Sequence, residues 1–419
     1  MMATGSNRMC LGKILALVVA ACACTLMIAS CSRGSDEIPE LSARSSYVNV
    51  FEQFDQAEAK TDPIERCMSY PTPQHLPWPQ TLVSVLCADL FTPVMQAGDI
   101  KQMIDGKDWK ALHDRYSGYL ERHYSGADPE KLLYRAFPKS SWKSSEEADI
   151  YTRKWVSAMP DDPFANTARG SVLVSAAWME RGNGYYREIP EANRRKMYKL
   201  ALQASVHLRK AVILEPKLLP AYYELIDAYM LGGKSEWIAP AAQAAIRQSP
   251  DTYYVRELAA EYVRKKWGGS LSDMDALIDN AEQHLKQNPR LGMIRNVREL
   301  ERGDLAIERK EYKSALASYR KALTSGPDHE ALVMAAFVAP KLGYKAEKIV
   351  YLTQDIRFSR DPRDSLMQRA AMWESDNDFK RALRDYAAAK EYYPIDAEID
   401  KRIAEAKARE QAMRKPKGP

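Results

Sequence analysis

The sequence has 419 residues, with 61 Lys and Arg against 56 Asp and Glu, and a formal net charge of +5 at pH 7. Removal of the first 30 residues, which carry Arg8 and Lys13, would leave +3. So small a charge argues against nucleic acid as a partner, and the length suits two or three domains or one long solenoid.

The first 30 residues have the organisation of a signal peptide. Arg8 and Lys13 are their only charges, and sixteen residues from Ile14 to Ala29 are apolar except Thr25. A membrane-spanning helix needs about 20 apolar residues, so this run is short for a span. An ordinary secretory signal and an uncleaved span are the alternatives to a lipoprotein signal.

The end of that run, Ile28-Ala29-Ser30-Cys31, resembles the bacterial lipobox. The resemblance implies cleavage before Cys31 and a diacylglycerol group on its thiol. Two or more acyl chains make membrane anchoring stable. Ser32 resembles the outer-membrane sorting signal of enteric-type bacteria. We therefore expect an outer-membrane lipoprotein of the cell envelope that faces the periplasm.

Only two cysteines, Cys67 and Cys87, follow Cys31 in the sequence. In an oxidising compartment two cysteines favour one disulfide, which here would close a proline-rich loop. Two buried free thiols are the alternative. Neither a close histidine pair nor C-x-x-C spacing is present, so we expect no metal site, and no cofactor motif is apparent.

The remaining chain has helical periodicity and few strand signals. Between Ile100 and Leu120, for example, apolar residues recur at three-to-four spacing with a turn at Gly106. We predict these segments: 31–50, a flexible tether; 51–99, an N-terminal helical and proline-rich segment; 100–290, a helical-repeat domain; 291–407, tetratricopeptide-like repeats; and 408–419, a basic tail.

Prolines and alanines recur at intervals typical of helix hairpins. Pro216 and Pro250 are 34 residues apart, and two later windows, 303–327 and 370–394, place Ala, Tyr and Pro in the same order. A small Ala lets two helices approach, an aromatic residue fills the adjacent groove and Pro stops the helix. These windows resemble the tetratricopeptide repeat, with a degenerate repeat between them. The predicted fold is all-α, an irregular α-solenoid of helix hairpins.

A second resemblance covers about residues 100–285. The stretches Trp178–Gly182 and Trp267–Ser270 are similar to a bacterial domain-of-unknown-function family, number 4034. That resemblance implies a helical-repeat fold and no established activity.

Two glycine-containing turns are the candidate sites. The segment 180–188 carries Arg181 with aromatic residues, and the segment 264–270 carries Trp267 with two lysines and a Gly pair before a helix capped by Ser270. Arg and aromatic residues are enriched at interaction hot spots, whereas structural turns are the alternative. On the first helix of the 216–250 repeat, Tyr223 and Asp227 are expected to be exposed on the concave face.

These features favour binding of a protein or peptide partner, as in an envelope scaffold or assembly factor, and the sequence holds no recognisable catalytic motif. One alternative is an enzyme acting on envelope polymer, which would require the Arg181 and Trp267 loops to converge in one pocket with ionisable groups. A toxin-neutralising inhibitor is another.

Overall fold

The computed structural model describes residues 47–73, 76–137, 142, 145–182, 184 and 186–414. The predicted signal peptide, Cys31 and most of the predicted tether lie outside these residues, as does the end of the predicted basic tail. Among the described helices, none combines the length and the apolar character that a membrane crossing requires.

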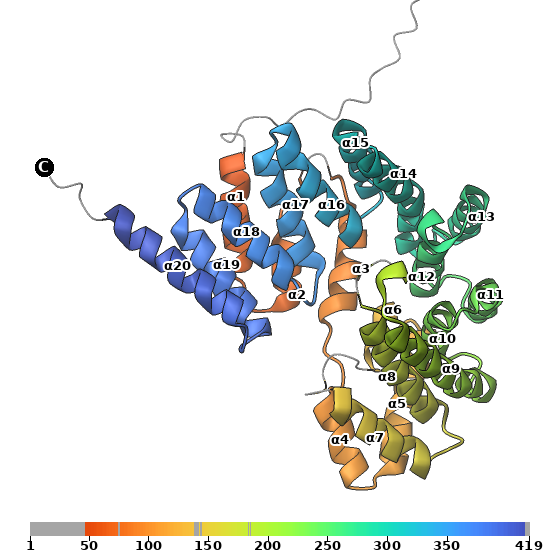
Figure 1. The fold of residues 1–419 in the computed structure, drawn as a ribbon. Coiled ribbons are helices and arrows are strands. Elements are labelled where there is room, and N and C mark those ends of the chain that lie inside the picture. Colours follow the sequence, from red (N-terminus) through yellow and green to blue (C-terminus); the bar gives the residue numbers. More distant parts are fainter. Residues whose placement is uncertain are drawn as a thin grey trace, which may run out of the picture. The chain divides into compact units, whose positions relative to one another are not determined.

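The described residues form helices and no β-strand (Figure 1). The α-helices are α1 (Val48–Glu58), α2 (Pro63–Ser69), α3 (Gln80–Phe91), α4 (Ala97–Asp105), α5 (Trp109–Tyr124), α6 (Glu130–Arg135), α7 (Ser145–Ala158), α8 (Pro163–Arg181), α9 (Glu191–Leu214), α10 (Leu219–Leu231), α11 (Ile238–Gln248), α12 (Tyr254–Tyr262), α13 (Leu271–Glu282), α14 (Asn296–Glu308), α15 (Tyr312–Leu323), α16 (His329–Val338), α17 (Lys345–Phe358), α18 (Arg363–Ser375), α19 (Phe379–Tyr392) and α20 (Ala397–Arg414). Short 3₁₀ turns link several of them: η2 (Tyr186–Glu188), η3 (Ser235–Trp237), η4 (Lys265–Trp267), η5 (Pro289–Arg295) and η6 (Ala339–Leu342).

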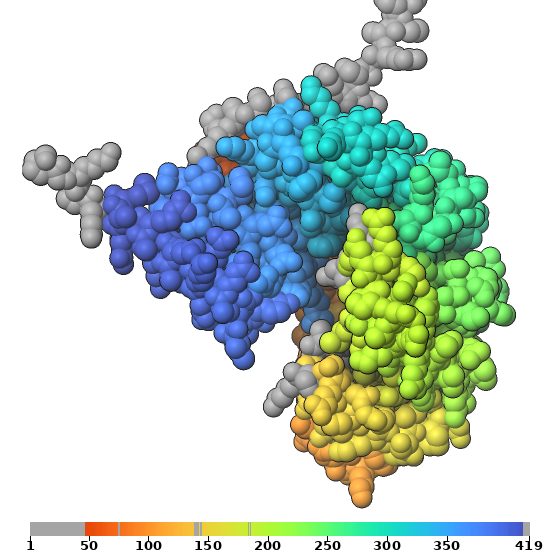
Figure 2. All heavy atoms as spheres, viewed as in Figure 1, coloured from red at the N-terminus to blue at the C-terminus, as the bar shows by residue number. Residues whose placement is uncertain are grey.

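Helices that follow one another in sequence pack together as hairpins. The main pairs are α8 with α9, α14 with α15, α16 with α17 and α18 with α19, and further contacts join each hairpin to the next. In Figure 2 the colours accordingly follow one another in neighbouring bands from green to blue. The prediction of an all-α, irregular solenoid of tetratricopeptide-like hairpins is confirmed.

The small and aromatic residues of the predicted repeats form the hairpin interfaces. Gly303 on α14 lies so close to α15 that a Cβ atom there would be 2.4 Å from the Tyr319 ring. Ala315 and Tyr319 are both fully buried, and so is Ala382 in the corresponding position of the α18–α19 hairpin. Close approach of the helix backbones therefore depends on these small side chains.

The N-terminal helices pack on the C-terminal repeats. Phe51 on α1 contacts Trp373 on α18 edge to face, with ring centroids 5.1 Å apart. On the following segment, Trp78 Nε1 donates to the Leu323 carbonyl oxygen at 2.5 Å. Figure 1 shows α1 and α2 beside α17 and α18, so segment 51–99 completes the core of the C-terminal repeats.

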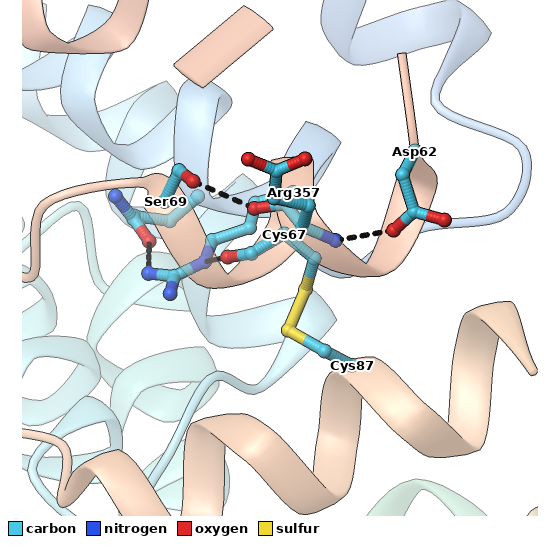
Figure 3. Close-up of a disulfide and its surroundings, with 7 residues drawn as sticks. Asp62, Cys67, Ser69, Cys87 and Arg357 are labelled. Atoms are coloured by element: carbon cyan, nitrogen blue, oxygen red, sulfur yellow. Dashed lines mark hydrogen bonds between the residues drawn. A yellow bond between two sulfur atoms is a disulfide. The ribbon is translucent and has the colours of Figure 1, made fainter. Parts of the chain in front are cut away.

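Cys67 on α2 and Cys87 on α3 are joined by a disulfide bond (Figure 3). Helix α2 begins with Asp62 as its N-cap, whose carboxylate accepts from the Glu65 backbone N–H at 2.7 Å, and Pro63 occupies the first turn. The Cys67 carbonyl oxygen accepts from Arg357 Nε on α17 at 2.7 Å. The disulfide and this hydrogen bond together tie α2 to α3 and α17.

Two helices extend across the predicted segment boundaries. Helix α1 begins at Val48, inside the predicted tether, because its buried aromatic face packs on the C-terminal repeats. At the other end, α20 extends to Arg414 and so includes part of the predicted basic tail. Its charged side chains are compatible with an exposed helix end.

Candidate functional site: the Arg181–Trp267 pocket

Arg181 and Trp267 come together, although 86 positions separate them in the sequence. Arg181 ends α8, and its guanidinium lies over two indole rings, 5.7 Å from the Trp178 centroid and 5.5 Å from the Trp267 centroid. Its Nη1 also donates to the carbonyl oxygens of Gly182 at 2.7 Å and Gly184 at 3.1 Å. A cation held between two indoles is fixed by its attraction to their π faces.

The turn that carries Trp267 is built by local sequence. Gly268 has a φ of +90°, in the left-handed region, and a Cβ atom at Gly269 would be 2.1 Å from the Val263 carbonyl oxygen, so both positions require glycine. Ser270 then caps α13 with a capping box to Asp273. The predicted N-cap is confirmed, and it fixes the chain direction just after Trp267.

Asp227 holds two side chains that contact the Arg181–Trp267 pair, Tyr262 and Trp178. Its carboxylate accepts from Tyr262 Oη at 2.5 Å and from Trp178 Nε1 at 3.4 Å. The Tyr262 ring in turn contacts the Trp267 ring edge to face, with centroids 5.6 Å apart. Burial, and then the Asp227 charge, raises the pKa of the Tyr262 hydroxyl well above its usual value, so this hydroxyl remains a hydrogen-bond donor at neutral pH.

The expectation that Asp227 is exposed is therefore wrong. Only 7% of its surface is accessible, because α8 and α12 both pack on α10 and cover the side that was assigned to the concave face. Tyr223 is half-buried, and its ring contacts the Tyr134 ring edge to face at 5.7 Å. Neither residue lines the Arg181–Trp267 pocket.

The pocket between these turns has a volume of about 860 Å³. Its lining joins the end of α8, η2, α9, the α10–η3 turn and η4; the lining residues are Arg181, Gly184, Tyr186, Glu188, Met197, Tyr198, Met230, Leu231, Gly233, Ser235, Lys266 and Trp267. We call it the Arg181–Trp267 pocket. Of its charged side chains two are cations and one is a carboxylate, so the pocket is net positive.

Two tyrosines on its rim are paired. The hydroxyls of Tyr186 and Tyr198 are hydrogen-bonded to each other, and the Arg194 guanidinium lies 5.7 Å from the Tyr186 centroid. The Tyr186 hydrogen bond and burial raise the pKa of the Tyr198 hydroxyl. Tyr186 belongs to segment 180–188, one of the two candidate turns, and Tyr185 in the same segment lies outside the described residues.

The Trp267 turn is also tied to a buried charge cluster. Trp267 Nε1 donates to Glu261 Oε1 at 2.9 Å, and Glu261 Oε2 accepts from Arg264 Nη1 at 2.9 Å. Glu261 also pairs with Lys266 at 2.7 Å. The side chain of Arg264 is fully buried, so one rim of the pocket depends on a charge in the interior.

A second cavity, of about 330 Å³, contains a His–Asp pair that the sequence did not indicate. His329 Nδ1 lies 2.6 Å from Asp355 Oδ1, and Asp355 Oδ2 accepts from Ser365 Oγ at 2.6 Å. His329 begins α16 and Asp355 lies on α17, so only the tertiary fold joins them. No motif connects these positions, and a histidine at a helix start carries no signal of its own.

The His329–Asp355 pair should make the free energy of unfolding depend on pH. The Asp355 hydrogen bond holds the pKa of His329 above its usual value of 6.5, although partial desolvation by neighbouring groups lowers it. The charges of Asp355, Asp328 and Glu330 raise it further. The contribution of the protonated His329 to the free energy of unfolding is complete below pH 6.5. It is lost as the pH rises through the raised pKa of His329. We expect His329→Gln to destabilise the protein more at about pH 5.5 than at about pH 9, by less than ~1 kcal/mol because the imidazole is exposed.

Urea unfolding of both proteins at the two pH values measures this difference. A Gln53→Ala variant, at an exposed position without a titrating side chain, is the control and should show the same small effect at both pH values. An equal effect of His329→Gln at both pH values would contradict the pairing.

No group of three or more His, Cys, Asp or Glu side chains among the described residues has the geometry to hold a metal ion. The lining of the Arg181–Trp267 pocket instead includes two cations, one indole, two phenols and the apolar side chains of Met197, Met230 and Leu231. These are the side chains with which protein surfaces bind other chains.

The fold and this pocket define the class as an all-α helical-repeat protein with a preformed surface pocket. No protein-family model matches the chain, so the resemblance to the domain-of-unknown-function family stays a prediction. A search of curated proteins finds no relative either.

Solved structures with similarity to the chain include tetratricopeptide-repeat proteins. The TPR domain of P58(IPK) is 14% identical, with 75% of this chain and 97% of that chain covered and a TM-score of 0.28. The APC/C hetero-tetramer Cut9–Hcn1 is 12% identical, with 85% of this chain and 66% of that chain covered and a TM-score of 0.34. A tetratricopeptide repeat protein from Parabacteroides merdae ATCC 43184 is 13% identical, with 63% of this chain and 99% of that chain covered and a TM-score of 0.27. With TM-scores this low, the fold assignment depends on the hairpins described above.

Proposed function

We propose that the chain is a partner-binding protein of the bacterial cell envelope and that the Arg181–Trp267 pocket binds a segment of a protein or peptide partner. The observation that carries this proposal is the convergence of two turns, from α8–α9 and α12–α13, on one net-positive, aromatic pocket of about 860 Å³. Arg and Trp are the residues most enriched at binding hot spots.

The pocket chemistry favours a segment with a carboxylate beside an apolar or aromatic side chain. Arg181 and Lys266 supply the positive charge, Trp267 supplies a flat face, and Met197 and Met230 supply adaptable apolar contacts. The Asp227–Tyr262 support holds Trp267 in position before the partner arrives, so little conformational entropy is lost on binding.

Substitution in the pocket should therefore release the partner. We expect Arg181→Glu and Trp267→Ala each to weaken partner binding by at least ~2 kcal/mol, or about 30-fold, because each removes a central contact. The measurement is crosslinking in intact cells, affinity capture and quantitative mass spectrometry. Arg309→Glu, an exposed charge reversal on the α14–α15 turn, is the matched control.

A partner lost in both pocket variants and kept in Arg309→Glu would support the proposal. A partner captured equally by all four proteins would place the binding surface elsewhere. Circular dichroism of each variant separates loss of binding from loss of folding.

An enzyme acting on envelope polymer is the second candidate. Such an enzyme would need the Arg181 and Trp267 loops to meet in one pocket with ionisable groups, and the two loops do meet there. Among the lining residues Glu188 is the one carboxylate, and no histidine is present. General acid–base catalysis would then have to use Glu188 with Tyr186 or Tyr198. Release of fragments from purified envelope polymer by the wild-type protein, and not by Glu188→Gln, would favour this candidate. A toxin-neutralising inhibitor, the other alternative from the sequence, has no specific feature of the pocket in its favour.

Anchoring through Cys31 is part of the proposal and is supported by the lipobox resemblance. Metabolic labelling with a fatty acid and fractionation of the membranes would test it. Labelled wild type in the outer-membrane fraction and unlabelled Cys31→Ala would support an outer-membrane lipoprotein. Labelled protein in the inner membrane would support acylation of Cys31 and contradict the outer-membrane location.

A further inference from the structure

A separate cavity of about 150 Å³ lies beside the disulfide, far in sequence from the Arg181–Trp267 pocket. Residues of α1, α2, α3, α17, α18 and α19 line it. Part of the wall is apolar, with Phe91, Ile356, Leu366 and Ala388, and the charged part includes Arg357.

Arg357 is buried without a carboxylate partner. Only 2% of its surface is accessible. Its Nε donates to the Cys67 carbonyl oxygen at 2.7 Å and its Nη1 to Gln354 Oε1 at 3.1 Å (Figure 3). Its Nη2 has no hydrogen-bond partner within the part of the chain that the structure describes.

Two other arginines of the cavity wall, Arg369 and Arg384, do have carboxylate partners. Arg369 forms a bidentate pair with Asp385, with both distances 2.7 Å, and also contacts Glu58. Arg384 pairs with Glu58 at 2.8 Å. Glu58 and Asp385 thus pair with other arginines, and no hydrogen bond or ion pair joins Arg357 to Glu391, the exposed third carboxylate of the lining, within the part of the chain that the structure describes. Arg357 is therefore a fully buried cation of the cavity wall that has no carboxylate partner.

An unpaired buried guanidinium is costly, because burial removes its hydration without supplying an anion. The same burial lowers the pKa of Arg357 to about 10. A carboxylate in the cavity would supply both the missing acceptor for Nη2 and the missing charge. Hydrogen bonds of this charge-assisted kind are about twice as strong as neutral ones.

We propose that this cavity binds a monocarboxylate with a small apolar body, its carboxylate on Arg357 and its apolar part against Phe91, Ile356 and Leu366. The volume of 150 Å³ corresponds to about five water molecules at roughly 30 Å³ each, which suits one amino-acid-sized group. The apolar wall and the nearby Glu58 and Asp385 disfavour a multiply charged inorganic anion. A free short acid and the C-terminal residue of a peptide share this chemistry.

Isothermal titration of the full-length protein with N-acetyl-leucine tests the proposal, with N-acetyl-leucinamide as the uncharged control. We expect binding of the acid and not of the amide. Arg357→Met should weaken it about 10- to 100-fold, the loss expected for one hydrogen bond to a charged group. Arg309→Met is the matched control and should bind like the wild type.

Ala388→Leu provides an independent variant, because it fills the cavity and leaves Arg357 and its hydrogen bonds intact. It should abolish binding even if Arg357→Met does not fold. Titration with Ala-Ala-Leu and its C-terminal amide identifies the source: tighter binding of the peptide acid indicates a chain terminus, and tighter binding of N-acetyl-leucine indicates a free acid. Equal binding of acid and amide, stronger binding of phosphate, no binding at all, or wild-type binding by Ala388→Leu would overturn the proposal.

Discussion

Arg264→Met is expected to lower the free energy of unfolding by ~3–5 kcal/mol, the usual cost of removing one partner from a buried charge cluster. The Arg264 guanidinium contacts Glu261 at 2.9 Å, Glu330 at 2.5 Å, Asp304, and Glu301 at 3.6 Å. Methionine would keep much of the packing and leave these carboxylates without their central cation.

Urea unfolding of wild type and variant measures this loss. Arg302→Met is the matched control, since Arg302 forms a half-exposed pair with Glu299 at 2.6 Å and should contribute less than ~1 kcal/mol. Equal midpoints for the two variants would contradict the role of Arg264. Because Glu261 also holds Trp267, Arg264→Met should weaken partner binding even under conditions where the variant remains folded.

Loss of the disulfide is expected to cost ~3 kcal/mol. Cys67 and Cys87 are 20 positions apart, and closing a loop of similar length restricts the unfolded chain by about that amount. The disulfide also holds α2 against α3, where the Cys67 carbonyl accepts from Arg357. Its removal should therefore weaken monocarboxylate binding in the cavity beside it.

The measurement compares urea unfolding of the oxidised wild type, the reduced wild type and Cys67→Ala/Cys87→Ala. The last two should have similar, lower midpoints, and reductant should leave the double variant unchanged. A wild-type midpoint that does not respond to reductant would show that the two cysteines contribute no covalent constraint.

The sequence predicted the hairpins because their signals are local. The apolar periodicity, the small Ala315 and Ala382, and the prolines between hairpins all act within about one repeat. The packing of α1 on α18 and α19 has no such signal. Asp55 pairs with Arg381 across 326 positions, and nothing in either local pattern shows that the two helices meet.

The candidate site was predictable in part for the same reason. Arg181 and Trp267 each lie in a turn whose glycines mark it in the sequence, but their meeting depends on how two hairpins pack. Asp227 was misplaced because a helical position defines a face and does not tell which neighbouring helix covers it. His329 and Asp355 form a pair only through the packing of α16 on α17.

A partner that occupies the Arg181–Trp267 pocket should be within crosslinking distance of the pocket lining. A photoactivatable amino acid at Ser235, an exposed residue of the pocket lining, tests it most directly in intact cells, with Glu308, exposed at the end of α14, as the control position. We expect a discrete crosslinked partner from Ser235, which is absent from Glu308 and lost when Arg181→Glu is added. The same adducts from both positions, or none from Ser235 under conditions where the protein is folded and correctly located, would contradict it.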